Sequence, residues 1–193
     1  MLKKFLNMTN EEIIGILIIL IAVFLVFSVN LRVSIRRARD AQRKSDVRSI
    51  SDSLNKYQND FGFFPLSEGG KIVACRGEIN STTGTYEFKA CEWAIDSLID
   101  ISDPSYLPYL SKIPYDPDKD KGASYYYLSN GKKYQIYAAL EGRDEAEYDL
   151  KIEARKLSCG IKICNFGLAS GALPLDKSIE EYENEMEKKN QEL

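Results

Sequence analysis

The sequence predicts an α+β fold. A long N-terminal helix, transmembrane at first and amphipathic afterwards, packs on a small domain with an antiparallel β-sheet. Three observations predict this fold. Residues 13–29 form an uninterrupted apolar run, which is typical of a helix surrounded by lipid. Apolar residues then recur at alternating steps of three and four up to Phe61, as on one face of a helix. The residues around Asn130-Gly131 are rich in β-prone side chains, which indicates a hairpin.

This pattern divides the 193 residues into segments, and the length leaves room for one domain of moderate size besides the long helix. The segments are a short basic leader-like segment (1–8), the transmembrane half of the helix (9–30), its amphipathic half (31–62), an α+β domain with an antiparallel sheet (63–177) and a charged C-terminal helix or tail (178–193).

The long helix is expected to begin at Thr9 and to end before Gly62. Thr9 and Glu12 have the T-x-x-E spacing of a capping box, in which each side chain accepts a hydrogen bond from the backbone of the other residue. Gly62 is a usual residue after a helix because it adopts positive φ without steric cost. The apolar stripe of the second half consists of Val47, Ile50, Leu54, Tyr57 and Phe61.

The clearest β signal is the hairpin formed by residues 124–129 and 133–140. Asn130-Gly131 between them suits a type I′ turn, which needs positive φ at both central residues. The tyrosine run 125–127 is either a binding platform or part of the sheet packing. Because successive strand residues alternate between faces, packing is the preferred interpretation.

Three further elements are expected outside the hairpin. Apolar residues at helical spacing predict a helix over residues 92–101, and residues 148–152 are a candidate strand. Ser178 and Glu181 form a second capping box, which predicts that a short charged helix begins there.

All four cysteines lie in the predicted globular part, as is typical of disulfides in an oxidising compartment. Four cysteines allow three pairings, and sequence proximity favours Cys75 with Cys91 and Cys159 with Cys164. Zinc or free thiols are the alternatives, although the spacings lack the CxxC of common zinc sites.

Composition argues against several functional classes. The net charge of −3 gives no global reason to expect nucleic acid as a partner. The basic residues from Arg32 to Arg48 are most simply a solvated or headgroup-facing side of the helix. The chain has no histidine, so the commonest general base and metal ligand is missing. We therefore do not expect an enzyme, since no nucleophile–base pair can be assembled.

Asp116, Asp118 and Asp120 are the candidate metal ligands, because three carboxylates in one loop suit calcium. Three features differ from an EF-hand: Gly122 is one place late, Pro117 lies inside the loop, and Tyr127 stands at the position of the bidentate glutamate. A solvated turn is therefore the preferred interpretation, and calcium is the one candidate cofactor.

Residues 36–65 (RRARDAQRKSDVRSISDSLNKYQNDFGFFP) and 109–141 (YLSKIPYDPDKDKGASYYYLSNGKKYQIYAALE) resemble type IV pilins and type II secretion pseudopilins. The resemblance implies a pilin-like fold and a filament subunit that assembles through its N-terminal helix. It implies as partners copies of the chain or other pilin-like subunits, an inner-membrane assembly platform and the lipid bilayer. The alternative is a single-pass anchored surface domain that binds a ligand or partner without polymerising.

The resemblance also assigns roles near the N-terminus. Asn7 and Met8 stand where the family has a glycine and then an aromatic residue at its processing site, so processing and permanent anchoring both stay open. Glu12 falls at the position of the family's glutamate, which would neutralise the terminal amine of a neighbouring subunit. The capping box is the other interpretation of Glu12.

Two arguments about membrane orientation conflict. More lysine and arginine follow the apolar run than precede it, which by the positive-inside rule would leave the domain in the cytoplasm. The cysteines and the resemblance indicate the opposite side. We expect a single-pass membrane protein whose C-terminal domain lies outside the cytoplasm, and in a cell-surface filament if the chain assembles.

Overall fold

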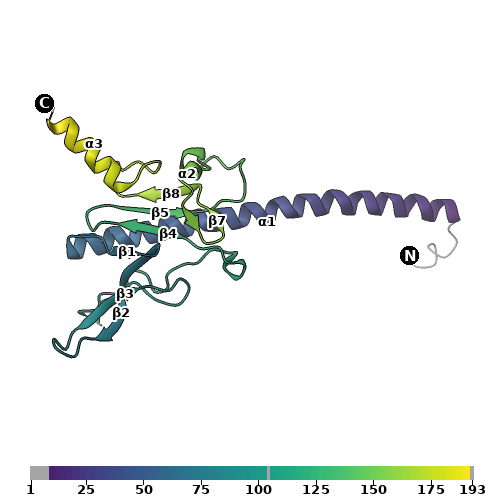
Figure 1. Cartoon of the computed structure of the whole chain (residues 1–193). Helices are drawn as coiled ribbons and strands as arrows, with labels where there is room; N and C mark the ends of the chain where they lie inside the picture. Colours follow the sequence, from purple (N-terminus) through teal and green to yellow (C-terminus); the bar gives the residue numbers. More distant parts are fainter. Residues whose placement is uncertain (1–8, 104, 192–193) are drawn as a thin grey trace. The chain divides into compact units, whose positions relative to one another are not determined.

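The computed structural model describes residues 9–103 and 105–191. The chain forms two compact units, one up to Arg39 and the other from Asp40 onward, and helix α1 (Asn10–Phe61) contributes to both (Figure 1). The predicted α+β fold is confirmed, with a long N-terminal helix and small antiparallel sheets.

The first unit is the apolar part of α1. From Ile13 to Phe27 its large apolar side chains are exposed. The helix is long and apolar enough, by length and composition, to cross a membrane. Its start has the predicted capping box: the Thr9 N–H donates to Glu12 Oε2 at 2.9 Å, and the Glu12 N–H donates to Thr9 Oγ1 at 3.4 Å. At the other end Gly62 takes the predicted positive φ, 79°.

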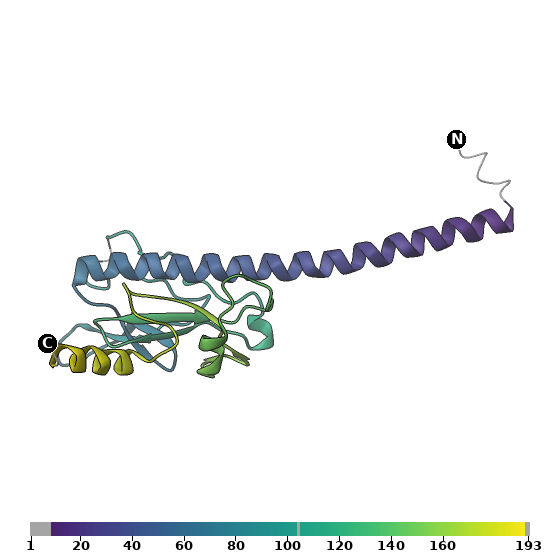
Figure 2. The ribbon, with the colours of Figure 1, turned by 90° about the horizontal axis from the view of Figure 1, so that it is seen from above.

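The second unit contains short strands arranged in the orders β1-β2-β3, β4-β5-β8 and β6-β7, all pairs being antiparallel. Figure 2 shows strands of this unit between the second half of α1 and helix α3. The elements are β1 (Leu66–Glu68), β2 (Lys71–Ile79), β3 (Tyr86–Ala90), η2 (Lys119–Lys121), β4 (Tyr126–Ser129), β5 (Tyr134–Ala138), α2 (Leu150–Ala154), β6 (Ser158–Cys159), β7 (Lys162–Ile163), β8 (Phe166–Ala169) and α3 (Ile179–Gln191).

The core of the second unit lies where α1 packs on the strands. Val47, Ile50 and Leu54 are completely buried, Tyr57 is nearly so, and Phe61 packs against them while partly exposed. The predicted apolar stripe is therefore confirmed. Its partners in the same core cluster include Phe64, Ile113, Tyr127, Tyr134 and Ile136.

The hairpin of β4 and β5 is confirmed, but its turn differs from the expectation. The strands pair as far as Ser129 and Tyr134, so residues 130–133 form the connection. Gly131 has a φ of 85°, whereas Asn130 does not take positive φ. The predicted type I′ turn is therefore wrong. Asn130 Oδ1 accepts hydrogen bonds from the N–H groups of residues 132 and 133, which closes the turn without positive φ at Asn130.

The helix expected over residues 92–101 is wrong. The segment forms turns, Ala94 takes a φ of 67°, and Leu98 pairs with Leu110 in an isolated antiparallel bridge. Leu98 is buried in the core, whereas Ile95 is 76% exposed. The apolar residues therefore do not share the one face that helical spacing would give them.

The strand expected over residues 148–152 is also wrong, because helix α2 begins there. Asp149 Oδ1 accepts the N–H of Lys151 at 2.7 Å, and this N-cap favours a helix over a strand. The capping box that opens α3 is confirmed. The Ser178 N–H donates to Glu181 Oε2 at 2.7 Å, and the Glu181 N–H donates to Ser178 Oγ at 3.1 Å.

Both disulfides join the predicted pairs. Cys75 in β2 is linked to Cys91 just after β3, and Cys159 is linked to Cys164 across the β6–β7 hairpin. Since every cysteine is oxidised, thiolate ligands for zinc are not present. The first disulfide closes the longer loop and constrains the unfolded chain more.

The tyrosine run belongs to the packing of the second unit. Tyr125 and Tyr127 are buried in the main core, while Tyr126 between them packs against a second cluster. The buried hydroxyls have partners: Tyr125 donates to Asp46 Oδ2 and Tyr127 to the Pro65 carbonyl, both at 2.7 Å. Packing therefore accounts for the run.

These tyrosines make the second unit sensitive to alkali. Burial raises the pKa of Tyr57 to about 12 and also raises the pKa of Tyr125, Tyr127 and Tyr137. In the unfolded chain the phenols ionise at about pH 10. The stabilisation present below that pH is therefore lost as the pH rises toward about 12.

We expect the full chain in detergent to lose its near-ultraviolet circular dichroism in one step between those pH values, together with ionisation of the buried tyrosines. Ionisation of all tyrosines near pH 10, with the structure intact, would contradict this expectation.

Candidate functional site

Two of the three aspartates predicted as calcium ligands surround a buried guanidinium group. Arg43 lies in α1 and is completely buried. Its Nε donates to Asp116 Oδ2 at 2.8 Å and its Nη2 to Asp116 Oδ1 at 2.9 Å, a bidentate pair. Nη2 also donates to Asp118 Oδ2 at 2.9 Å. These carboxylates are therefore paired with a cation of the protein itself.

Two more carboxylates complete the cluster. Arg43 Nη1 donates to Asp40 Oδ1 at 2.8 Å and to Glu141 Oε1 at 2.7 Å. Asp40 in turn accepts the backbone N–H groups of Glu141 and Gly142. All five N–H donors of the guanidinium are thereby satisfied. The cluster joins α1 to the segment before η2 and to the segment after β5.

Lysines also contact this cluster. Lys162 Nζ donates to Asp118 Oδ2 at 2.7 Å, and Lys121 Nζ donates to Asp118 Oδ1 at 2.9 Å. The hydrogen bond from Lys162, followed by that from Lys121, holds the pKa of Asp118 well below its usual range. Asp120, the third candidate ligand, is exposed. Within residues 9–103 and 105–191, no group of three or more His, Cys, Asp or Glu side chains is arranged to hold a metal ion.

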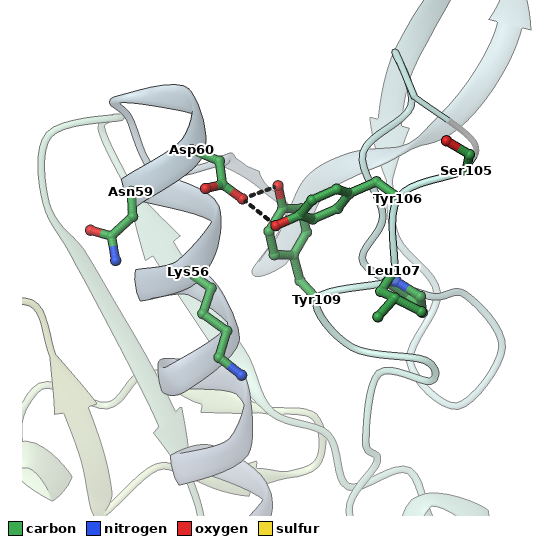
Figure 3. Close-up of a pocket in the computed structure, with 8 residues that line it drawn as sticks. Lys56, Asn59, Asp60, Ser105, Tyr106, Leu107 and Tyr109 are labelled. Carbon is green, nitrogen blue, oxygen red and sulfur yellow. Dashed lines mark hydrogen bonds between the residues drawn. The ribbon is translucent and has the colours of Figure 1, made fainter.

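A separate cleft of about 590 Å³ lies beside the last turns of α1. Figure 3 shows Tyr106 and Tyr109 with their hydroxyls directed at Asp60. These hydroxyls donate to Asp60 Oδ2 at 3.2 and 2.7 Å. Burial and the Asp60 carboxylate raise the pKa of Tyr109, and the hydrogen bond to Asp60 raises that of Tyr106. Both phenols therefore stay protonated at neutral pH and donate to the carboxylate.

The lining of this cleft combines apolar and polar groups. Leu107 is 81% exposed beside the two tyrosine rings, and Lys56 and Asn59 present an amine and an amide from the helix. An apolar wall with a few polar groups is typical of sites that bind small molecules or peptide segments. The cleft is open to solvent, and its apolar surface is formed by Leu107, Pro108 and the two tyrosine rings.

Of the residues assigned near the N-terminus, Glu12 lies within the part of the chain that the structure describes. Glu12 Oε2 accepts from the Thr9 N–H at 2.9 Å and from Thr9 Oγ1 at 3.1 Å, so the capping interpretation is confirmed. The role of Glu12 in assembly stays a prediction, because it concerns a neighbouring subunit. Asn7 and Met8 lie outside the described residues.

Sequence reasoning missed Arg43 and Asp40, although a signal for both was present. Continuing the alternating steps of three and four backward from Val47 reaches Arg43 and then Asp40. Charged residues in the register of a buried stripe have to be paired, because an isolated buried charge is costly. The cleft had no comparable signal, since Asp60 and Tyr109 are brought together only by the fold.

Comparison with protein-family models, with curated proteins and with solved structures finds no match for this chain. What the chain does is therefore inferred from its sequence pattern and from the geometry described above.

Proposed function

We propose that this chain is a pilin or pseudopilin, a structural subunit of a type IV pilus or type II secretion-like filament that assembles through its N-terminal helix. One observation carries the proposal: α1 exposes large apolar side chains from Ile13 to Phe27 and continues into a disulfide-linked domain. An apolar surface of that extent has to be covered by lipid or by other helices. The likeness of residues 36–65 and 109–141 to this family supports coverage by the helices of other subunits.

The apolar surface supports the proposed partners, and the disulfides support the proposed location. In the bilayer, lipid covers the apolar part of α1. In a filament, the corresponding helices of copies of this chain or of other pilin-like subunits cover it, after an inner-membrane assembly platform extracts it. The two disulfides favour an oxidising compartment. We therefore propose that the C-terminal domain lies outside the cytoplasm.

Glu12 tests the proposal, because its two interpretations predict different results for one variant. Glu12→Gln keeps a capping-box side chain at this position but removes its charge. If Glu12 neutralises the amine of a neighbouring subunit, the variant stays in the membrane and its share in sheared filaments falls steeply, because an unpaired charge in lipid is costly. If Glu12 only caps the helix, incorporation is normal, and only Glu12→Ala loses stability, by about 1 kcal/mol.

Glu11→Ala is the matched control, since Glu11 lies in the same helical turn but not in the capping box. The measurement is the share of each variant in sheared filaments relative to its level in the membrane. The intact mass of the purified chain shows in addition whether residues 1–7 are removed. Normal incorporation of Glu12→Gln would rule out the charge-neutralising role.

The second candidate function is a single-pass anchored domain that binds a ligand at the cell surface and does not polymerise. The cleft beside Asp60, Tyr106 and Tyr109 favours it. On this alternative the chain keeps residues 1–7, stays in the membrane fraction and is absent from sheared filaments. The mass and fractionation measurements described above therefore distinguish the two functions.

A further inference from the structure

Strand β3 is an open edge. It is the outer strand of the sheet β1-β2-β3, and β2 is its partner on the inner side. The side chains from Tyr86 to Lys89 are all exposed. Figure 1 shows β2 and β3 extending away from the other strands of the unit. The outer side of β3 therefore presents backbone N–H and C=O groups that are available to another strand.

One face of this edge is mainly apolar and also carries the Arg76 side chain, which pairs across the strands with Phe88. Phe88 is 50% exposed, and Ile79 and Tyr86, which pair across the two strands, are 58% and 39% exposed. The guanidinium of Arg76 lies over the Tyr86 ring, 4.3 Å from its centre. Tyr86 and Phe88 share a face because they are two residues apart in a strand. An open edge with an exposed apolar face is a typical place for association with a further strand.

The charges of β3 are complementary to a second copy of β3. In an antiparallel pair centred on Phe88, Glu87 lies opposite Lys89 of the other copy, and Lys89 lies opposite Glu87. The two Phe88 rings meet on the other face. Cross-strand pairs of opposite charge and aromatic pairs both stabilise a sheet. A contact of this kind is isologous and closes as a dimer.

Neighbouring registers lack this complementarity. A pair centred on Glu87 would place two glutamates opposite each other, and a pair centred on Lys89 would place two lysines opposite each other, which is destabilising. A register centred between two residues, which shifts one strand by a single residue against the other, would place Phe88 opposite a charged residue and so bring the apolar face against the charged one. Of these registers, the one centred on Phe88 alone places opposite charges together.

We propose that two copies of this chain associate through their β3 edges, antiparallel and in the register centred on Phe88. The contact goes beyond assembly through the N-terminal helix and does not depend on it. A pair of five-residue strands buries less surface than a stable complex needs. Two chains anchored in one membrane, however, meet at a raised effective concentration.

The charged residues are accessible for this role. Glu87 Oε1 accepts a hydrogen bond from Asn80 Nδ2 at 2.9 Å, and Lys89 Nζ lies 3.9 Å from Asp96 Oδ2. Glu87 and Lys89 are both exposed, whereas Asp96 is partly buried, so each exchanged variant is first checked for a near-ultraviolet circular dichroism spectrum equal to that of the parent chain.

The test uses the full chain in lipid vesicles, with Phe88→Cys as the probe. Every native cysteine is in a disulfide, so the new thiol is the only one free to form a covalent dimer. Directly opposite residues have Cα atoms about 4.5–5.5 Å apart, which suits a disulfide. We expect rapid dimer formation on mild oxidation. Tyr86→Cys, the matched control, should link slowly, because it faces Ala90 of the other copy rather than itself.

Charge exchange in the Phe88→Cys background tests the register. Glu87→Lys alone and Lys89→Glu alone should each slow dimer formation by about fivefold or more, because two cross-strand pairs become like-charged. The combination of both substitutions restores the opposite charges, and we expect it to recover the original rate. Equal linking by Tyr86→Cys and Phe88→Cys, or no recovery in the combined variant, would overturn the proposal. Because Glu12→Gln leaves β3 unchanged, failure here and failure of filament assembly are separable.

Discussion

Replacing Leu54 with aspartate unfolds the unit from Asp40 onward. Leu54 is completely buried in the core formed by α1 and the strands. Losing such a side chain costs about 2–5 kcal/mol. The new carboxylate would be buried without a cationic partner, which costs several more. Since domains are stable by about 5–15 kcal/mol, the sum is large enough to unfold this one.

The full chain in detergent micelles is suited to this measurement, because its buried tyrosines report on packing. We expect Leu54→Asp to lose the near-ultraviolet circular dichroism at room temperature while the apolar part of α1 keeps its helical signal. Leu150→Asp is the matched control, since Leu150 is 67% exposed in the first turn of α2. Unchanged melting of Leu54→Asp would contradict the packing described here.

Replacing Arg43 with methionine is expected to destabilise the same unit by about 3–5 kcal/mol, because removing one partner of a buried ion pair leaves its carboxylates uncompensated. The guanidinium donates to four carboxylates, and Asp40 and Asp116 among them are as completely buried as Arg43 itself. The loss therefore comes from unpaired buried charge more than from lost volume.

Two comparisons test that cause by urea denaturation in micelles. Arg48→Met is the matched control, because Arg48 lies on the exposed side of the same helix, and we expect it to change stability by less than about 0.5 kcal/mol. Adding Asp40→Asn and Asp116→Asn to Arg43→Met removes two of the unpaired charges and should recover part of the loss. A triple variant less stable than Arg43→Met alone would show that charge is not the main cause.

Local patterns were sufficient for the parts of the fold that they fully specify. The two capping boxes, the apolar stripe and the end of α1 at Gly62 involve residues a few positions apart. The hairpin between β4 and β5 was likewise recognisable from its Asn-Gly pair. The disulfide pairs were predicted because each joins the nearest cysteines in sequence.

The wrong predictions fall where distant contacts outweigh local pattern. Residues 92–101 have helical spacing, yet Leu98 pairs with Leu110 and the Ile113 carbonyl accepts the N–H of Ala94 at 3.0 Å. The turn at Gly131 also departs from its expected type. The Asn130 side chain accepts hydrogen bonds from the N–H groups of residues 132 and 133, and these bonds hold the turn without positive φ at Asn130. Tertiary pairing and side-chain hydrogen bonds decided both segments.

The sequence by itself determined the long helix, its apolar first half, its buried stripe and the partners of its cysteines, because periodicity and proximity are properties of the chain. Only the tertiary structure decided what the aspartates do. Asp116 and Asp118 are far in sequence from Arg43, and a carboxylate binds whichever cation the fold brings within reach. Two aspartates of a loop that suited calcium are therefore part of a buried ion-pair cluster, because the fold brings them to the guanidinium of Arg43, whose five N–H groups need acceptors.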